Sequence, residues 1–450
     1  MSLTISRETN EYRLLMLLPG AQGILVEPEH CPPRLPRLVI PKGVRAARAL
    51  QQLIEDTWRV NSIVLDVIPA RNDFPSCAVV EIRHGDSGPL PRGVSCMDLE
   101  SLNNFHLRDE ELSSLRQALS RETIVGPPFR RLGWVDEAMG WIRTALKYPP
   151  EFNGHVQQLN VGGSFALVRF GTSQGPAYWL KAVGSPNESE FTMTTWLAER
   201  YPQYLPPIKA ARSDWNTWVM EEVGTSLSDS ITDNEIDRVG TALADFQRES
   251  ETGADEFLTV GCSDQRTDTL RNHITEVFHY LSDVLKMEDH RSPLSLDRLK
   301  EIEGSIRSAC DRIERLGIPD AINSNDLKLA NILCDDTRCV FTDWCHSYVG
   351  NPFLTFQHLH TYLRRTSPPL AERFRSAYGS QWRSRLDGHQ IRVAFALAPP
   401  LAAFAYLCGN GRWLTSSIKH EATSRSHSLL LLKHLNRATG DPHFLEALCG

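Results

Sequence analysis

Hydrophobic and polar residues alternate along the first part of the chain in the pattern of short strands around one helix. Aliphatic runs bounded by Pro, Gly or charged residues predict strands, and they lie at Leu14–Leu18, Ile24–Val26, Leu38–Ile40, Ile63–Ile68 and Ala78–Ile82. Apolar residues at helical spacing around Leu53 predict a helix between the third and fourth runs. A second apolar helical face follows, and Gly126-Pro127-Pro128 then marks a boundary.

A different pattern begins after this boundary. Trp134 and Trp141 lie on one face of a predicted helix, and packing against the neighbouring sheet is the usual reason for such a pair. Strands are predicted near residues 156–159, 166–170 and 178–181. From about residue 222 the pattern becomes helical, beginning with a capping box formed by Thr232 and Glu235. The sequence therefore predicts a sheet-rich part followed by a largely helical part.

The stretch from Ala321 to Trp344 carries the clearest chemical signal in the chain. A short loop with Asp326, Lys328 and Asn331 leads into two apolar strands joined by a polar turn, and the second strand ends at Asp343. We call residues 321–344 the carboxylate hairpin. Phosphoryl transfer needs a carboxylate that receives the acceptor's proton and hard oxygen ligands for Mg²⁺. An ordinary surface hairpin explains one such carboxylate, but it does not explain the combined spacing.

On these residues the chain resembles the aminoglycoside phosphotransferase and choline kinase-like family, whose members are small-molecule kinases with a protein-kinase-like fold. Ser324-Asn325-Asp326, Asn331 and Thr342-Asp343-Trp344 stand where that family has its catalytic loop and metal loop. The resemblance implies that Asp326 accepts or orients the hydroxyl proton of the acceptor. It also implies that Asn331 and Asp343 hold Mg²⁺, and that Lys328 neutralises charge on the transferred phosphoryl group.

The same resemblance implies an ATP site in the preceding sheet-rich part. A turn containing Gly162, Gly163 and Ser164 lets backbone N–H groups approach phosphate oxygens closely. Lys181 ends a predicted strand and would grip the phosphates of ATP, held by Glu190 from the next helix. Glu188 is a competing partner for this lysine.

The acidic end of another apolar run resembles the hinge of the same family. It reads Trp218-Val219-Met220-Glu221-Glu222. The resemblance implies that backbone groups from Met220 to Glu222 hydrogen-bond the adenine ring, with the side chains less important.

Two positions depart from the family pattern. Ser324 replaces the usual His of the catalytic loop, and Thr355 stands where an Asp commonly braces that loop. Both are supporting positions, so no reacting group is lost. These departures leave a second hypothesis open: a nucleotide-binding scaffold of the pseudokinase type, whose N-terminal domain recognises a partner. Because Lys328 is typical of protein kinases, a protein substrate is a further alternative, although no Ala-Pro-Glu segment follows Asp343.

The N-terminal strands and helix resemble a degenerate Nudix hydrolase domain. Ile40-Pro41-Lys42-Gly43 precedes the helix, but Gln52 occupies the place of a metal-binding Glu and Trp58 that of a Gly. An unrelated small α/β domain fits equally well. The predicted fold class is α+β, a two-lobed protein-kinase-like fold with an additional N-terminal α/β domain. The predicted parts are an N-terminal domain at 1–126, a linker and packing helix at 127–154, an N-lobe at 155–221 and a helical C-lobe at 222–450.

Composition narrows the class of partners. The 450 residues are 41% hydrophobic and 23% charged, which is typical of a globular protein. The net charge of −7 argues against nucleic acid or an anionic membrane as a partner. We find no apolar run long enough to span a membrane and no N-terminal signal pattern, and therefore expect a cytoplasmic protein. The oligomeric state stays open.

Ten cysteines are present without a CxxC pair, so reduced thiols are expected. Cys334, Cys339, Cys345 and His346 lie close in sequence, but they straddle the carboxylate hairpin and are poor candidates for a zinc site. The expected acceptor is a hydroxylated small molecule. Residues 264–289 mix acidic and basic side chains and do not define it further.

Overall fold

In the computed structural model the chain forms two compact units. Unit 1 comprises Met1–Phe191 and Pro207–Glu222, and unit 2 comprises Thr192–Pro206 and Val223–Gly450. Both helices and strands are present, as the predicted α+β class requires. The structure describes residues 8–21, 23–30, 32–71, 74–83, 92–100, 105–120, 128–161, 165–228, 231–287, 294–409 and 422–449.

The first sheet of unit 1 contains six strands with the order β4-β5-β1-β2-β6, and β3 also pairs with β1. The pair β1 and β5 is parallel, and the other pairs are antiparallel. The predicted helix around Leu53 is present as α1. The elements are β1 (Thr9–Leu17), β2 (Ile24–Val26), β3 (Arg37–Pro41), α1 (Ala46–Trp58), β4 (Asn61–Ile68), β5 (Ser76–Arg83), β6 (Ser95–Met97) and α2 (Asp109–Leu119).

Strand β1 is buried on both faces, because successive side chains of a strand point to opposite sides of the sheet. Leu14 and Met16 pack with the apolar face of α1 in one core. Leu15 and Leu17 belong to a second core on the other face. The sequence of this strand is therefore a continuous apolar run and does not alternate between apolar and polar residues.

The second sheet of unit 1 has five antiparallel strands in the order β10-β11-β9-β8-β7. The strands predicted near 156–159, 166–170 and 178–181 are all present in it. The elements are α3 (Trp134–Ala145), β7 (Phe152–Asn160), β8 (Phe165–Thr172), β9 (Tyr178–Val183), α4 (Ser189–Arg200), β10 (Ile208–Arg212) and β11 (Thr217–Glu221).

The two sheets of unit 1 share one apolar core. Helix α3 contributes Trp134 to the same cluster as Phe170 and Leu180 of the second sheet and Leu15 of the first. The packing role predicted for the helix is therefore confirmed. Polar side chains reinforce this contact: the fully buried Gln158 of β7 donates to Val64 O (2.9 Å) of the first sheet and accepts from Val64 N (2.6 Å).

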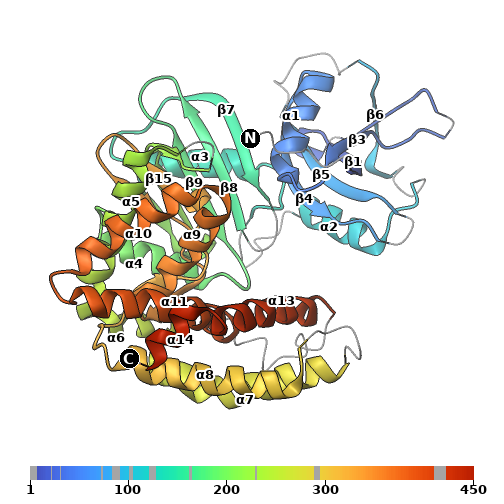
Figure 1. Cartoon of the computed structure of the whole chain (residues 1–450). Helices are drawn as coiled ribbons and strands as arrows, with labels where there is room; N and C mark the ends of the chain where they lie inside the picture. The colour runs from blue at the N-terminus through green and yellow to red at the C-terminus, as the bar shows by residue number, and fades with distance from the viewer. Residues whose placement is uncertain are drawn as a thin grey trace. The chain divides into compact units, whose positions relative to one another are not determined.

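Unit 2 is mainly helical, with two small three-stranded sheets of order β12-β15-β16 and β13-β17-β14. Helices α7 and α8 pack side by side, and α11 contacts α9 and α13 (Figure 1). The elements are β12 (Thr225–Ser226), α5 (Asp233–Ser250), α6 (Ala254–Thr259), β13 (Ser263–Gln265), α7 (Thr267–Met287), α8 (Leu296–Glu314), β14 (Ala321–Ser324), β15 (Ile332–Cys334), β16 (Cys339–Phe341), β17 (Ser347–Gly350), α9 (Pro352–Thr366), α10 (Pro368–Trp382), α11 (Gly388–Gly409), α13 (Ala422–Thr439) and α14 (Pro442–Cys449).

Local signals determine how α5 begins. The Thr232 hydroxyl accepts a hydrogen bond from Glu235 N (3.3 Å), and the Glu235 carboxylate accepts one from Thr232 N (2.7 Å). These two bonds satisfy backbone donors that the first turn of a helix leaves without a partner. The predicted capping box is confirmed.

Helix α11 corrects the expectation that no apolar run is long enough to span a membrane. Residues 388–408 meet that requirement by length and composition. In the structure 67% of the most apolar window of this helix is buried inside unit 2. Its residues Leu397, Leu401 and Phe404 belong to the core of the unit, so α11 packs as a core helix.

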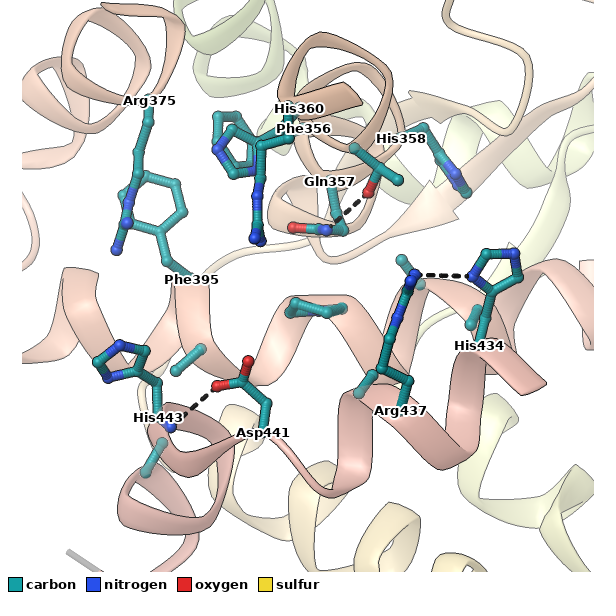
Figure 2. Close-up of a pocket in the computed structure, with 18 of the residues that line it drawn as sticks. Phe356, Gln357, His358, His360, Arg375, Phe395, His434, Arg437, Asp441 and His443 are labelled. Atoms are coloured by element: carbon teal, nitrogen blue, oxygen red, sulfur yellow. Dashed lines mark hydrogen bonds between the residues drawn. The ribbon is translucent and has the colours of Figure 1, made fainter. Parts of the chain in front are cut away.

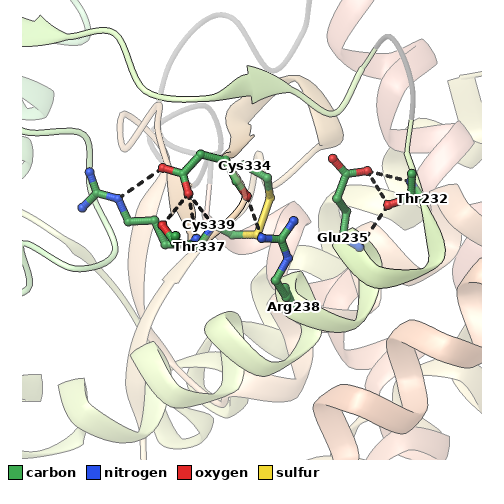
Figure 3. Close-up of a disulfide and its surroundings, with 8 residues drawn as sticks. Thr232, Glu235, Arg238, Cys334, Thr337 and Cys339 are labelled. Carbon is green, nitrogen blue, oxygen red and sulfur yellow. Dashed lines mark hydrogen bonds and ion pairs between the residues drawn. A yellow bond between two sulfur atoms is a disulfide. The ribbon is translucent and has the colours of Figure 1, made fainter.

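A disulfide joins Cys334 and Cys339 across the β15–β16 hairpin (Figure 3). The two residues are directly paired in the strand register, which brings their Cα atoms to 4.3 Å. The expectation of reduced thiols is wrong for this pair, because strand pairing places the two sulfurs within bonding distance. With both sulfurs bonded to each other, the set considered for zinc loses two of its four ligands.

Candidate active site

The loop of the carboxylate hairpin begins where β14 ends at Ser324. Asn331 donates from its amide Nδ2 to the backbone oxygen of Asp326 (2.9 Å), and Lys328 donates to the Asp326 carboxylate (2.7 Å). The three polar residues predicted for this loop are thus brought together. Asn331 is almost fully buried, whereas the Asp326 carboxylate keeps a third of its surface exposed.

Backbone contacts bring Asp343 to the same end of the hairpin. Thr342 donates from its N–H to the backbone oxygen of Asn331 (2.9 Å), and its hydroxyl donates to the same oxygen (3.2 Å). Asp343 follows directly with a φ of 69°, which lies in the left-handed region. A non-glycine residue occupies this region at a cost, and such residues are frequent at functional sites.

The oxygen atoms at this end of the hairpin suit a magnesium ion. Because the Nδ2 of Asn331 is committed to Asp326, its Oδ1 is the amide atom left for a cation. The carboxylate of Asp343 is a second hard oxygen donor from the same segment, and Mg²⁺ prefers ligands of this kind. That Asn331 and Asp343 bind the metal stays a prediction. The chemistry of their oxygen atoms agrees with it.

The two departures from the family pattern contact each other. The Thr355 hydroxyl accepts a hydrogen bond from Ser324 N (3.1 Å) and donates to Ser324 O (3.2 Å). The Tyr348 hydroxyl lies 3.0 Å from the same Thr355 oxygen. Thr355, from the first turn of α9, therefore braces the start of the loop through its backbone. The position thus keeps a bracing contact even though it lacks a carboxylate.

A buried polar network supports the loop from below. Gln247 of α5 donates to Asn323 Oδ1 (2.8 Å) and accepts from the Tyr378 hydroxyl (2.8 Å). Asn323 in turn donates to the backbone oxygens of Ala321 and Gly350. Buried polar groups of this kind fix a single arrangement when all members are hydrogen-bonded.

In unit 1 the predicted pair of Lys181 and Glu190 is present. The ammonium of Lys181 donates to the Glu190 carboxylate, and both side chains are buried. This contact decides against Glu188 as the partner. The ammonium also lies over the rings of Phe165 and Trp218. Removing one member of a buried ion pair leaves an uncompensated charge, so the two residues depend on each other.

The predicted hinge residues lie in and just after β11. Met220 pairs with Trp179 of β9 and Ile208 of β10. The Glu222 carboxylate accepts hydrogen bonds from Arg169, which lower the pKa of Glu222, and it also accepts one from Trp179. Glu222 N donates to Ala177 O (2.9 Å), so this N–H is not available for the predicted adenine contact. Gly162, Gly163 and Ser164 lie outside the described residues.

A cavity of about 830 Å³ in unit 2 was not predicted from the sequence (Figure 2). Helices α9, α10, α11, α13 and α14 all contribute side chains to it. The signal that could have revealed it is the density of His and Arg residues between His358 and Arg375. A substrate pocket was considered at residues 264–289, and the described part of that segment, 264–287, does not line the cavity.

No protein-family model matches the sequence, and no curated protein is significantly similar to it. Several solved structures align with most of the chain. A choline/ethanolamine kinase family protein from Mesorhizobium loti is 14% identical with a TM-score of 0.46, covering 70% of this chain and 98% of its own. A macrolide 2'-phosphotransferase from Brachybacterium faecium is 15% identical with a TM-score of 0.44, covering 66% of this chain and 98% of its own.

A putative fructosamine-3-kinase from Thermobifida fusca is 16% identical with a TM-score of 0.42, covering 67% of this chain and 98% of its own. These neighbours are small-molecule kinases and phosphotransferases by description. At such identities and TM-scores the likeness carries no argument about the activity of this chain. The functional case therefore depends on the residues of the site.

Proposed function

We propose that the chain is an ATP-dependent phosphotransferase with a two-lobed protein-kinase-like fold, and that it acts on a hydroxyl group of a small molecule. The observation that carries the proposal is the carboxylate hairpin. Asp326, Asn331 and Asp343 are fixed at one end of it by hydrogen bonds within the segment and from α9. Two carboxylates and an amide oxygen in this arrangement are the groups that phosphoryl transfer requires.

In this mechanism the Asp326 carboxylate orients the acceptor hydroxyl and receives its proton as the hydroxyl oxygen bonds to the γ-phosphorus of ATP. The bond from that phosphorus to the β–γ bridging oxygen breaks, and ADP leaves. Mg²⁺, when bound with ATP, neutralises charge on the phosphate oxygens, and Asn331 and Asp343 would hold it. Lys328 lies beside the Asp326 carboxylate (2.7 Å), where its charge can also stabilise the transferred phosphoryl group. Lys181, held by Glu190, would position the phosphates of ATP.

The scaffold hypothesis was based partly on Thr355 as a weak brace. The two hydrogen bonds from Thr355 to the Ser324 backbone supply a brace, so this reason for expecting inactivity loses weight. We expect turnover with a suitable acceptor rather than nucleotide binding alone.

The proposal is tested by comparing two nearly isosteric variants, because the two carboxylates should fail differently. Asp343→Asn removes a charge that faces Mg²⁺, so it should weaken Mg²⁺-dependent ATP binding together with turnover. Asp326→Asn should leave Mg²⁺–ATP affinity nearly intact and lower turnover by roughly 10²- to 10⁴-fold, the range for a lost general base. Calorimetry with ATP at fixed Mg²⁺ and single-turnover phosphate transfer to a panel of hydroxylated acceptors provide the measurements.

Asp336→Asn is the matched control, since Asp336 is an exposed carboxylate in the turn of the same hairpin. It should change neither quantity. Loss of ATP binding in Asp326→Asn with normal binding in Asp343→Asn would reverse the assigned roles. Tight Mg²⁺–ATP binding by the wild type without transfer to any acceptor would favour the scaffold instead.

A further inference from the structure

The cavity in unit 2 is strongly basic. Its lining includes five arginines and six histidines but only two carboxylates. The arginines are Arg364, Arg365, Arg375, Arg392 and Arg437. The chain as a whole has a net charge of −7, so this local excess of basic residues runs against the overall composition. We call this cavity the basic cavity.

In the described part of the chain, ion pairs do not compensate the arginines of the basic cavity. Among the residues that the structure describes, none of its five arginines forms an ion pair with a carboxylate. Arg373, on the same helix as Arg375 but outside the cavity lining, pairs with Asp237 and Asp233 of α5. Arg437 instead donates to His434 Nδ1 (3.2 Å), another basic residue of the lining (Figure 2). A cavity lined by several arginines without acidic partners attracts an anion.

A buried histidine in the lining lacks the partners that it needs. His360 is 7% exposed, and within the described part of the chain neither of its ring nitrogens has a hydrogen-bond partner. Its ring stacks on Phe356 at 5.0 Å between centroids. Burial lowers the pKa of His360 to about 4, and the charges of Arg375 and Arg364 lower it further. A buried polar group without a partner costs free energy unless a ligand or water satisfies it.

One end of the basic cavity lies beside the carboxylate hairpin. Thr355 of α9 holds the backbone of Ser324, and His358, which lines the cavity, follows it one helical turn later. Burial lowers the pKa of His358 to about 4, and the Asp326 carboxylate is close enough to oppose this effect. His358 is thus the lining residue that connects the basic cavity with the loop of Asp326.

We propose that the basic cavity is the acceptor site and that the acceptor is a hydroxylated small molecule already carrying a phosphate group. The inference rests on the proposed phosphotransferase function. Arginine presents a planar fork of donors that matches phosphate oxygens. Phe356, Phe395 and Pro399 supply apolar surface for the rest of the molecule. The volume of about 830 Å³ lies in the range of small-molecule sites. A cationic acceptor would meet like charges here.

Direct binding separates the inference from the proposed function. Calorimetry is carried out with the full chain saturated with Mg²⁺–ADP, so that phosphate probes do not occupy the nucleotide site. The probes are glucose 6-phosphate, ribose 5-phosphate and glycerol 3-phosphate, with their unphosphorylated parents and choline as comparisons. At least one phosphorylated probe should bind at least tenfold more tightly than its parent, and choline should not bind.

The double variant Arg364→Gln/Arg437→Gln should weaken that binding by tenfold or more. Arg383→Gln is the matched control, since Arg383 is an exposed arginine that does not line the cavity, and it should bind like the wild type. The inference is overturned if no phosphorylated probe binds, if parents bind equally well, or if the double variant is unaffected. Phosphate-selective binding without transfer of phosphate from ATP would instead overturn the proposed function and leave the cavity as a binding site for a phosphorylated molecule.

Discussion

The carboxylate hairpin and the basic cavity lie in the same unit but are built in opposite ways. The residues of the hairpin come from one segment, Asp326 to Asp343, and hydrogen bonds of side chains and backbone within that segment bring them together. The basic cavity collects side chains from five helices, between Phe356 and Ala447. We infer that the reacting groups are specified locally, whereas the selection of the acceptor depends on how the helices of unit 2 pack.

The two regions also differ in their charge balance. In the hairpin the Asp326 carboxylate is paired with Lys328, so positive and negative charges meet directly. In the basic cavity the arginines have no acidic partner among the described residues. In the Asp326–Lys328 pair, the lysine can stabilise negative charge that develops during phosphoryl transfer. The arginines of the basic cavity, which lack acidic partners, are suited to binding an anion.

The hairpin depends on α9 at one point, the contact from Thr355 to the Ser324 backbone. The variant Thr355→Val tests whether the hairpin keeps its geometry without that contact. The change keeps the side-chain shape but removes both hydrogen bonds to the Ser324 backbone. Because a small displacement of a reacting group can cost about 100-fold in rate, we expect turnover to fall roughly 10- to 100-fold. Stability should fall by about 1–3 kcal/mol. Single-turnover rates and urea unfolding provide the measurements.

Thr366→Val is the control for this change, because the Thr366 hydroxyl donates to the backbone oxygen of Tyr362 in its own helix. It should leave the rate unchanged. An unchanged rate in Thr355→Val would show that the loop holds its geometry without α9.

The disulfide tests whether covalent closure is needed to hold the hairpin. In Cys334→Ala/Cys339→Ala the paired strands and the Asp335 N to Arg338 O bond should persist, so we expect turnover close to that of the wild type. Stability should fall by about 2 kcal/mol, the chain-entropy value for so short a loop. Urea unfolding followed by Trp fluorescence measures the loss.

The matched control is Cys449→Ala, which removes an exposed thiol in the same unit. It should leave stability unchanged. A large loss of turnover in the double alanine variant would mean that the hydrogen bonds of the hairpin do not suffice to place Asp343.

The basic cavity should make unit 2 sensitive to acid. The folded state lowers the pKa of His360 from an ordinary value of 6.5 to about 4. Between these values the unfolded chain binds a proton that the folded chain does not, so stability falls as pH drops from about 6.5 toward 4. At pH 5 the loss from this residue should be roughly 1–2 kcal/mol relative to pH 7.

His360→Phe removes the titrating group and keeps an aromatic ring against Phe356. The loss of stability between pH 7 and pH 5 should be smaller in this variant than in the wild type, as measured by urea unfolding at both pH values. His389→Phe is the control, because His389 lines the same cavity but is exposed. An equal pH dependence in wild type and His360→Phe would mean that His360 is not buried as a neutral ring.

Much of the candidate site could be predicted because its signals are local. The spacing of Asp326, Asn331 and Asp343 predicts that the three residues lie at the same end of the hairpin. A short loop followed by a tight hairpin allows few other arrangements. The capping box at Thr232 and the strand that carries Lys181 are likewise signals within a few residues, although this strand continues to Val183. Such patterns depend on backbone geometry that is the same in every protein.

Other features were decided only by tertiary structure. The sequence left Glu188 and Glu190 as competing partners of Lys181, and the orientation of α4 selects Glu190. The cysteine spacing did not show that Cys334 and Cys339 are direct strand partners. The arginines of the basic cavity are scattered over helices whose mutual packing no local pattern fixes. Burial and charge at such a site arise from long-range contacts, and the sequence determines them only through the complete fold.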